Sequence, residues 1–180
     1  MRIPLMMMLG LGPTVARLKL RRCESVGLRP TVWGRVWIHG EGEIQVGHRV
    51  LFDARMAPIE LHAQRGARIV LDDDVTIEGG SSIEAQSYVT VGARSRLGMW
   101  CKVLDNMYHP LRGNRHARPQ SVPIVLEEGV TVGSRSILLP GAHLQRGASV
   151  APGTVISRRI PAGVSVGGSP ARVLRREVAR

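Results

Sequence analysis

The strongest constraint in this 180-residue sequence is a six-residue repeat. From Leu126 onward an aliphatic residue returns at every sixth position: Leu126, Val132, Leu138, Leu144, Val150 and Ile156. Four positions after each of the first five stands a small or β-branched residue: Val130, Ser136, Ala142, Ala148 and Thr154. Neither the 3.6-residue period of a helix nor the two-residue alternation of a simple strand gives this pattern.

A period of six predicts a prism of stacked coils. Each hexad supplies a short strand and a tight turn, three hexads close one coil, and coils stack at about 4.8 Å. The aliphatic residue then points inward onto its equivalents, and the residue four positions later must be small because it points inward near a corner. The chain has a single Phe and only 3% aromatic residues, which suits thin, regular layers. The sequence therefore predicts an all-β fold, a parallel β-helix.

The same register appears upstream with slips. We expect an irregular first coil at Val46 and Phe52, and then a segment from Pro58 to Arg68 that leaves the coil. Two more coils follow, with inward residues Leu71, Ile77 and Ile83, then Val91, Leu97 and Val103. We divide the chain into a basic cap (1–30) with a short helix over 14–26, a β-helix (31–161) and a basic closing tail (162–180).

One long break interrupts the repeat. The chain leaves the coil after Val103 and returns by Leu126, so an external loop is predicted at 105–125. A β-helix tolerates such a segment only outside its stack, and such loops often carry function. This loop holds two of the six histidines, His109 and His116, together with Asp105 and Asn106.

Residues 44–176 resemble the hexapeptide-repeat acyltransferases, especially the sugar O-acetyltransferase and maltose/galactoside acetyltransferase group. The resemblance rests on the loop pair His109-Pro110, the turn Pro140-Gly141, and the stretches GTVISRRIP (153–161) and GGSPARVLR (167–175). It implies a left-handed β-helix, a homotrimer, and acetyl-CoA lying between neighbouring subunits.

The resemblance also implies roles for individual residues. His109 matches the catalytic base. A group of others matches positions that line coenzyme A: Ser136, Gly141, Ala142, Ala151, Ser157, Arg158, Arg172 and Arg175. We expect acceptor contacts from Glu84, Asp105 and Asn106. The chain departs from the family pattern where a Trp is expected at 130–133, and it lacks a clear match for the acceptor-side Asn.

The function expected from this resemblance is acetyl-CoA-dependent O-acetylation of a sugar or glycan precursor, as in polysaccharide biosynthesis. The alternatives are N-acetylation of an amino sugar or other amine, and a non-catalytic scaffold. A carbonic anhydrase of the γ type would need three His ligands, and no third His falls at a convincing spacing from His109 and His116. Cys23 and Cys101 lack metal-ligand spacing and are expected to be reduced thiols, so no metal is expected.

The net charge of +11 is concentrated at the two ends of the chain. Without aromatic interleaving, this charge does not favour a nucleic-acid partner. The apolar stretch Ile3–Leu11 is too short to span a bilayer. We therefore expect a cytoplasmic protein with a small-molecule or lipid-linked sugar acceptor. Its basic N-terminus is hypothesised to touch the inner face of an anionic membrane.

Overall fold

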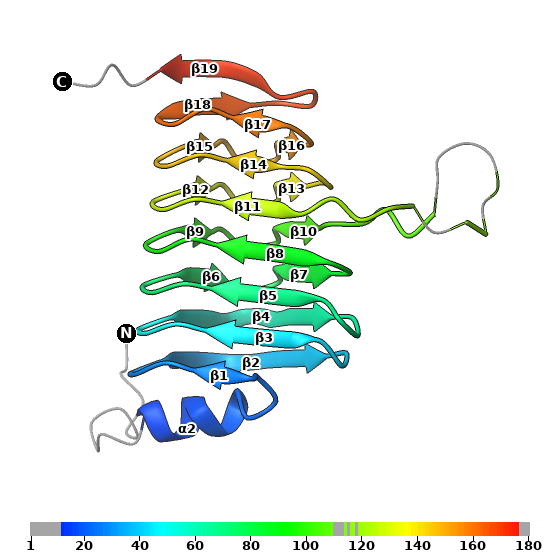
Figure 1. The fold of residues 1–180 in the computed structure, drawn as a ribbon. Coiled ribbons are helices and arrows are strands. Elements are labelled where there is room, and N and C mark those ends of the chain that lie inside the picture. Colours follow the sequence, from blue (N-terminus) through cyan, green and yellow to red (C-terminus); the bar gives the residue numbers. More distant parts are fainter. Residues whose placement is uncertain (1–11, 110–113, 115, 118, 177–180) are drawn as a thin grey trace.

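In the computed structural model, residues 12–109, 114, 116–117 and 119–176 are described; the Ile3–Leu11 stretch and Pro110 lie outside them. The described chain forms one short helix and a tall stack of strands (Figure 1). The elements are α2 (Gly12–Lys19), β1 (Ser25–Val26), β2 (Thr31–His39), β3 (Glu43–Val46), β4 (Leu51–Ala63), β5 (Arg68–Leu71), β6 (Thr76–Glu78), β7 (Ser82–Ala85), β8 (Tyr88–Val91), β9 (Arg96–Leu97), β10 (Lys102–Leu104), β11 (Ile124–Leu126), β12 (Thr131–Val132), β13 (Ile137–Leu138), β14 (His143–Leu144), β15 (Ser149–Val150), β16 (Val155–Ile156), β17 (Arg159–Ile160), β18 (Val164–Gly167) and β19 (Arg172–Arg176).

The strands form the three faces of a prism. The front face is a seven-stranded sheet in the order β1-β3-β5-β8-β11-β14-β17. A twelve-stranded sheet makes the other two faces, because the long strands β2 and β4 run on across the corner between them. In Figure 1 the near strands run leftward and the far strands rightward as the chain climbs, which is a left-handed winding. The expected fold class, a left-handed parallel β-helix, is confirmed.

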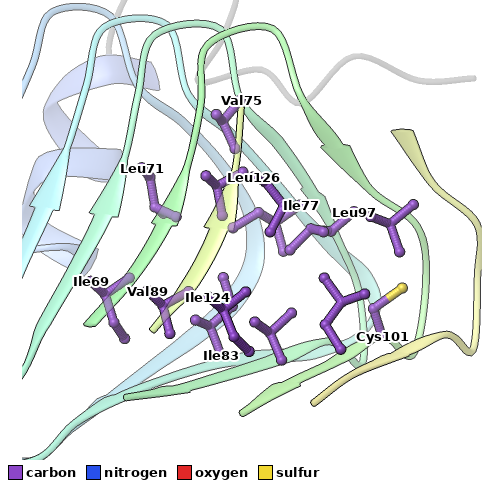
Figure 2. Packing of buried hydrophobic residues seen from close by; sticks show 14 of the residues in the cluster. Ile69, Leu71, Val75, Ile77, Ile83, Val89, Leu97, Cys101, Ile124 and Leu126 are labelled. Atoms are coloured by element: carbon purple, nitrogen blue, oxygen red, sulfur yellow. The ribbon is translucent and has the colours of Figure 1, made fainter. Parts of the chain in front are cut away.

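The inward ladder of the repeat is the core of the molecule. The predicted aliphatic residues lie in register on successive coils, as in Leu97 against Val132 and Val132 against Val150. Each of these three side chains is at most 3% exposed. Figure 2 shows such side chains converging on the interior of the coil. The small residues predicted at the corners are also buried, because no space remains there for larger ones.

One corner of the prism repeats a left-handed backbone. At the turns between the second face (β6, β9, β12, β15) and the third face (β7, β10, β13, β16), φ is positive at Gly80, Trp100, Arg135 and Gly153. The backbone N–H of Trp100 donates to the carbonyl of Gly79 in the coil below, and that of Arg135 to the carbonyl of Met99. A residue other than glycine costs about 1–3 kcal/mol in this conformation.

The early coils differ from the sequence prediction. The excursion expected at 58–68 is wrong, because β4 runs unbroken from Leu51 to Ala63 and pairs with both β6 and β7. The first coil already begins at Ser25 of β1, since the N–H of Glu24 donates to the carbonyl of Ile44. The helix accordingly ends at Lys19, before the expected end at residue 26.

Both ends of the stack are covered. Helix α2 lies beneath the first coil, with Ala16 and Leu20 buried against it. The Arg17 Nη2 donates to the carbonyl of Gly27 at 2.7 Å and the Lys19 Nζ to that of Gly34 at 2.8 Å. At the other end β18 extends the coil beyond the expected boundary at 161, and β19 folds back on it antiparallel. Among the described residues there is no helix that is long and apolar enough to cross a membrane.

Candidate active site at the loop corner

The external loop leaves the stack at one corner of the prism. Strand β10 ends at Leu104 and β11 begins at Ile124, so the loop occupies 105–123, close to the predicted 105–125. Figure 1 shows it projecting sideways between β10 and β11. We call the edge that joins the third face back to the front face the loop corner; on the next two coils it consists of 139–142 and 157–158.

Asp105 anchors the base of the loop. Its side chain is fully buried, and its carboxylate accepts three backbone hydrogen bonds from the turn between β7 and β8. The donors are the N–H groups of Gln86 at 2.7 Å, Ser87 at 2.7 Å and Tyr88 at 2.8 Å. Charge-assisted bonds of this kind are about twice as strong as neutral ones. The carboxylate that was expected to contact an acceptor is therefore occupied by the protein's own backbone.

Asn106 closes the neck of the loop. Its Nδ2 donates to the carbonyl of Pro119 at 2.8 Å and to the Ser121 Oγ at 2.9 Å, on the returning chain. Its Oδ1 accepts the N–H of Tyr108 at 2.6 Å. Asn106 is only 2% exposed. Like Asp105, it holds the loop in place and has little surface left for an acceptor.

A strained turn directly precedes the predicted catalytic histidine. The N–H of His109 donates to the carbonyl of Met107 at 2.7 Å, and Tyr108 between them has a φ of 61°. This is a γ-turn with a positive central φ, which is rare and strained. Strain of this kind persists only where surrounding contacts enforce it, and it concentrates at functional sites. His109 itself is exposed.

Asn106 holds one end of this strained turn, and Glu84 holds the Tyr108 side chain at its centre. The Tyr108 hydroxyl donates to the Glu84 Oε2 at 2.7 Å. Burial, and then the hydrogen bond to this carboxylate, raise the pKa of Tyr108 to about 12, so the phenol remains a donor at neutral pH. Glu84, expected to contact the acceptor, thus holds the loop against the third face.

We call the Tyr108–Glu84 hydrogen bond the loop brace. Two rows of outward-facing residues on the third face lie next to it. In one row His39, His62 and Glu84 are successive register partners. The rings of His39 and His62 have centroids 6.1 Å apart. The hexad pattern of the sequence singles out neither histidine. Their spacing along the chain differs from the hexad period, because β2 and β4 run through their corners, so only the pairing register brings them beside Glu84.

The neighbouring row carries further polar groups. Its members are successive register partners: Trp37, Glu60, Ser82 and Lys102. The Lys102 Nζ donates to the Ser82 Oγ at 2.9 Å, and this hydroxyl lies 3.5 Å from the Glu84 Oε1. The third face therefore presents a polar line that ends at the loop brace.

Part of the predicted coenzyme A set lies on the loop corner. Gly141, Ser157 and Arg158 stand on this edge, on the two coils beyond the loop, each coil adding about 4.8 Å. Gly141 has a φ of 81°, and its N–H donates to the carbonyl of Val122 at 3.2 Å as the loop returns. The Arg158 Nη2 donates to the carbonyl of Ala171 at 2.8 Å. The structure thus brings these residues into one line with the loop.

The rest of the predicted set is buried or lies away from the loop corner. Ser136 and Ala142 are fully buried, and the Ser136 Oγ donates to the carbonyl of Ala151 at 3.1 Å. Ala151 stands at the corner between the second and third faces. Arg172 and Arg175 are exposed on β19, opposite Gly167 and Ser165. In the described part of the chain, no three His, Cys, Asp or Glu side chains form a group that could hold a metal ion.

Comparison with known sequences gives a short match to an N-acetyltransferase. No family model matches the chain. A curated relative, 2,3,4,5-tetrahydropyridine-2,6-dicarboxylate N-acetyltransferase of Staphylococcus aureus, is 35% identical over 57 residues, which are 32% of this chain and 24% of the relative. The matched stretch thus spans about a quarter of the relative's length.

Solved structures match over most of the chain. AntD, an N-acyltransferase from Bacillus cereus in complex with dTDP and coenzyme A, has a TM-score of 0.71 and 16% identity over 90% of this chain and 88% of its own. The hexapeptide-repeat acetyltransferase VCA0836 from Vibrio cholerae, with acetyl-CoA, has a TM-score of 0.65 and 20% identity over 88% and 74%. The polysialic acid O-acetyltransferase OatWY has a TM-score of 0.59 and 13% identity over 84% and 87%. The expected likeness to hexapeptide-repeat acyltransferases is thereby confirmed at the level of the fold.

We predict that the Tyr108–Glu84 hydrogen bond keeps the neck of the loop, residues 107–109, ordered. Replacing Tyr108 by Phe removes the donor, and a half-exposed bond to a carboxylate is worth about 1 kcal/mol, so amide exchange at Met107–His109 should rise about fivefold. Hydrogen exchange followed by mass spectrometry measures this. The urea midpoint of unfolding should stay unchanged, because the stack itself keeps its core.

The matched control is Tyr88→Phe, which alters the chain's other tyrosine, on β8. It should leave exchange at the loop neck unaltered. Equal exchange in wild type and Tyr108→Phe would show that the bond does not order the turn.

Proposed function

We propose that this left-handed β-helix protein is an acetyl-CoA-dependent acyltransferase that acetylates a hydroxyl of a sugar or glycan precursor, with His109 as general base. One observation carries the proposal. His109 follows a strained turn that Asn106 and Glu84 hold in place, at the foot of the corner on which Gly141, Ser157 and Arg158 stand. The fold shared with coenzyme A complexes of AntD and VCA0836 supports it.

The proposed chemistry is a direct transfer. The imidazole of His109 takes the proton of the acceptor hydroxyl while its oxygen attacks the thioester carbonyl. A carbon–oxygen bond forms and the carbon–sulfur bond breaks, and the proton passes from the imidazole to the departing sulfur. An imidazole suits both steps because its ordinary pKa lies near neutrality. The developing oxyanion requires a fixed donor, for which backbone N–H groups at the corner are suited.

We assign the donor to the loop corner. The exposed Ser157 and Arg158 are proposed to meet the adenine end of coenzyme A, and Arg172 and Arg175 its 3′-phosphate, since guanidinium groups bind phosphate well. Gly141 on the loop corner offers a small surface for the pantetheine arm, and Ala151, on the corner between the second and third faces, offers one from a neighbouring subunit. The buried Ser136 and Ala142 act by shaping the corners. A homotrimer, in which the arm lies between neighbouring subunits, belongs to the same proposal.

N-acetylation of an amino sugar or other amine is the second candidate. It is favoured by the curated relative and by AntD, both N-acyltransferases, whereas OatWY acetylates oxygen. The product distinguishes the two, because hydroxylamine cleaves an ester and leaves an amide intact.

The His109 proposal predicts a loss of turnover without a loss of fold. Replacing His109 by Ala should lower kcat about 10²–10⁴-fold, the usual contribution of general-base catalysis. Free-thiol release from acetyl-CoA, with a panel of sugar, nucleotide-sugar and amine acceptors, measures this. His116→Ala, in the same loop, should keep wild-type kcat. A His109→Ala protein with normal turnover would exclude this base, and failure to bind coenzyme A in calorimetry would favour a scaffold.

The phosphate assignment predicts a change in donor preference. The Arg172→Ala, Arg175→Ala double variant should raise the KM for acetyl-CoA a few-fold, because exposed charge pairs contribute about 0.2–1 kcal/mol each. The KM for acetyl-dephospho-CoA, which lacks the 3′-phosphate, should not change. Arg159→Ala, an exposed arginine on β17, is the control and should affect neither. An equal rise for both donors would contradict the assignment.

We also propose that the N-terminal cap contacts an anionic membrane. Arg21 and Arg22 are exposed just after helix α2, and Leu18 near the end of the helix is 62% exposed. Basic residues near such a surface contribute about 1 kcal/mol each, so Arg21→Glu with Arg22→Glu should weaken binding to phosphatidylglycerol vesicles by about 30-fold or more. Co-sedimentation measures this, with Arg65→Glu plus Arg159→Glu as the charge-matched control. Equal loss in both double variants would contradict the proposal.

A further inference from the structure

The third face carries a pocket at the edge away from the loop. This shallow pocket of about 190 Å³ lies between the outward row and the corner that holds Trp100. Its main lining residues are two indoles, a proline, a glycine, a carboxylate and an ammonium group: Trp37, Trp100, Pro58, Gly80, Glu60 and Lys102. Trp37 and Trp100 are 48% and 50% exposed. Pockets for drug-sized ligands have volumes of about 300–1,000 Å³, so this one suits a single ring.

Trp100 stands where the backbone favours glycine. The equivalent corner position is Gly80 one coil below and Gly153 two coils above, and all three have positive φ. A bulky residue is unfavourable in this conformation. The ring lies flat against Gly80, where an added Cβ would come within 2.3 Å of the Trp100 Cε3. Backbone preference does not account for the Trp, and the half-exposed indole forms a wall of the pocket.

The polar side of the pocket continues to the loop brace. Glu60, Ser82 and Lys102 are register partners on β4, β7 and β10. Lys102 Nζ donates to Ser82 Oγ at 2.9 Å, that hydroxyl lies 3.5 Å from Glu84, and Glu84 accepts the Tyr108 hydroxyl at 2.7 Å. The pocket and the Tyr108–Glu84 bond at the root of the loop thus belong to one face.

Flat aromatic faces beside a carboxylate and an ammonium group suit one class of ligand. A pyranose has an apolar face of C–H groups that packs on an indole, and hydroxyls at its rim that a carboxylate accepts from and an ammonium donates to. We propose that this pocket binds one pyranose unit of the acceptor, with the ring on Trp100 and Trp37 and its hydroxyls at Glu60 and Lys102.

The distance to the loop indicates which unit is bound. Ser82 at the pocket and Glu84 at the brace are two residues apart on β7, a separation of about 7 Å. A ring held in the pocket therefore lies about one sugar unit from the loop. The pocket anchors a non-reacting unit, and the acceptor is a di- or oligosaccharide or a nucleotide- or lipid-linked sugar. This role in transfer rests on the proposed function; binding of the ring does not.

Binding is tested without acetyl-CoA. Methyl glucoside, methyl galactoside, N-acetylglucosamine, cellobiose, lactose and UDP-N-acetylglucosamine are titrated separately into the full chain, with tryptophan emission as the readout and UDP alone as a separate arm. At least one sugar should shift the emission. Trp100→Gly and Trp37→Ala should weaken that sugar's binding at least tenfold, and His109→Ala should bind it like wild type.

Arg135→Gly is the matched control, because it makes the same backbone change at the same corner one coil further on. It should leave sugar binding unchanged. Neither glycine variant should lower Tm, since glycine suits this turn, so lost binding in Trp100→Gly cannot be ascribed to unfolding. Once a transferring acceptor is found, Trp100→Gly should raise its KM at least tenfold and leave kcat and the KM for acetyl-CoA unchanged.

Four results would overturn the pocket proposal. They are no response to any sugar at tens of millimolar, an equal response in Trp100→Gly, a response to UDP alone that matches the nucleotide sugar, and a smaller assembly of the Trp variants in sedimentation, which would make the patch a contact between copies. Sugar binding without acetyl transfer would instead refute the proposed function and leave the pocket standing.

Discussion

The backbone hydrogen bonding from coil to coil is the constraint on which this structure depends. Each turn donates to the carbonyl of the coil below or above, as Trp100 does to Gly79 and Arg135 to Met99, so every coil must repeat the path of its neighbour. The interior is then narrow and uniform. It admits one aliphatic residue per face and small residues near the corners, which is the six-residue pattern of the chain. A side chain can vary freely only where it points outward, so any chemistry must lie on the faces and corners or in segments that leave the stack.

The loop at 105–123 is the one long segment of the described chain that leaves the stack, and the fold fixes it at its root. Asp105 is buried in the turn between β7 and β8, and Asn106 joins the outgoing and returning strands. These contacts, with the Tyr108–Glu84 bond, hold a strained turn immediately before His109. A rigid stack thus holds the root of the loop in a defined position, which is the arrangement that the proposed general base requires.

Much of the fold could be predicted because the inward pattern is local in sequence. The coils from Leu71 to Ile83 and from Leu126 to Ile156 have the predicted inward residues, and the loop begins where it was predicted. The prediction was wrong at 58–68, where β4 runs straight through a corner and the hexad period is lost. At the candidate site, Asp105, Asn106 and Glu84 were predicted to contact an acceptor, and the structure engages all three in contacts within the protein instead. Apart from the short-range bond between the Tyr108 N–H and Asn106, these contacts could not be predicted from the sequence, because the partners lie 13 to 24 residues away.

The sequence by itself determined the β-helix, the position of its break and the histidine within that break, since each follows from the spacing of residues along the chain. Only the tertiary structure decided which outward residues share a face. The rows His39–His62–Glu84 and Trp37–Glu60–Ser82–Lys102 exist because of pairing register between coils of unequal length. The Trp100 pocket exists because a turn with positive φ lays an indole on the glycine of the coil below. The inward ladder is periodic and the outward surface is not, so the scaffold was readable from the chain and the proposed acceptor pocket was not.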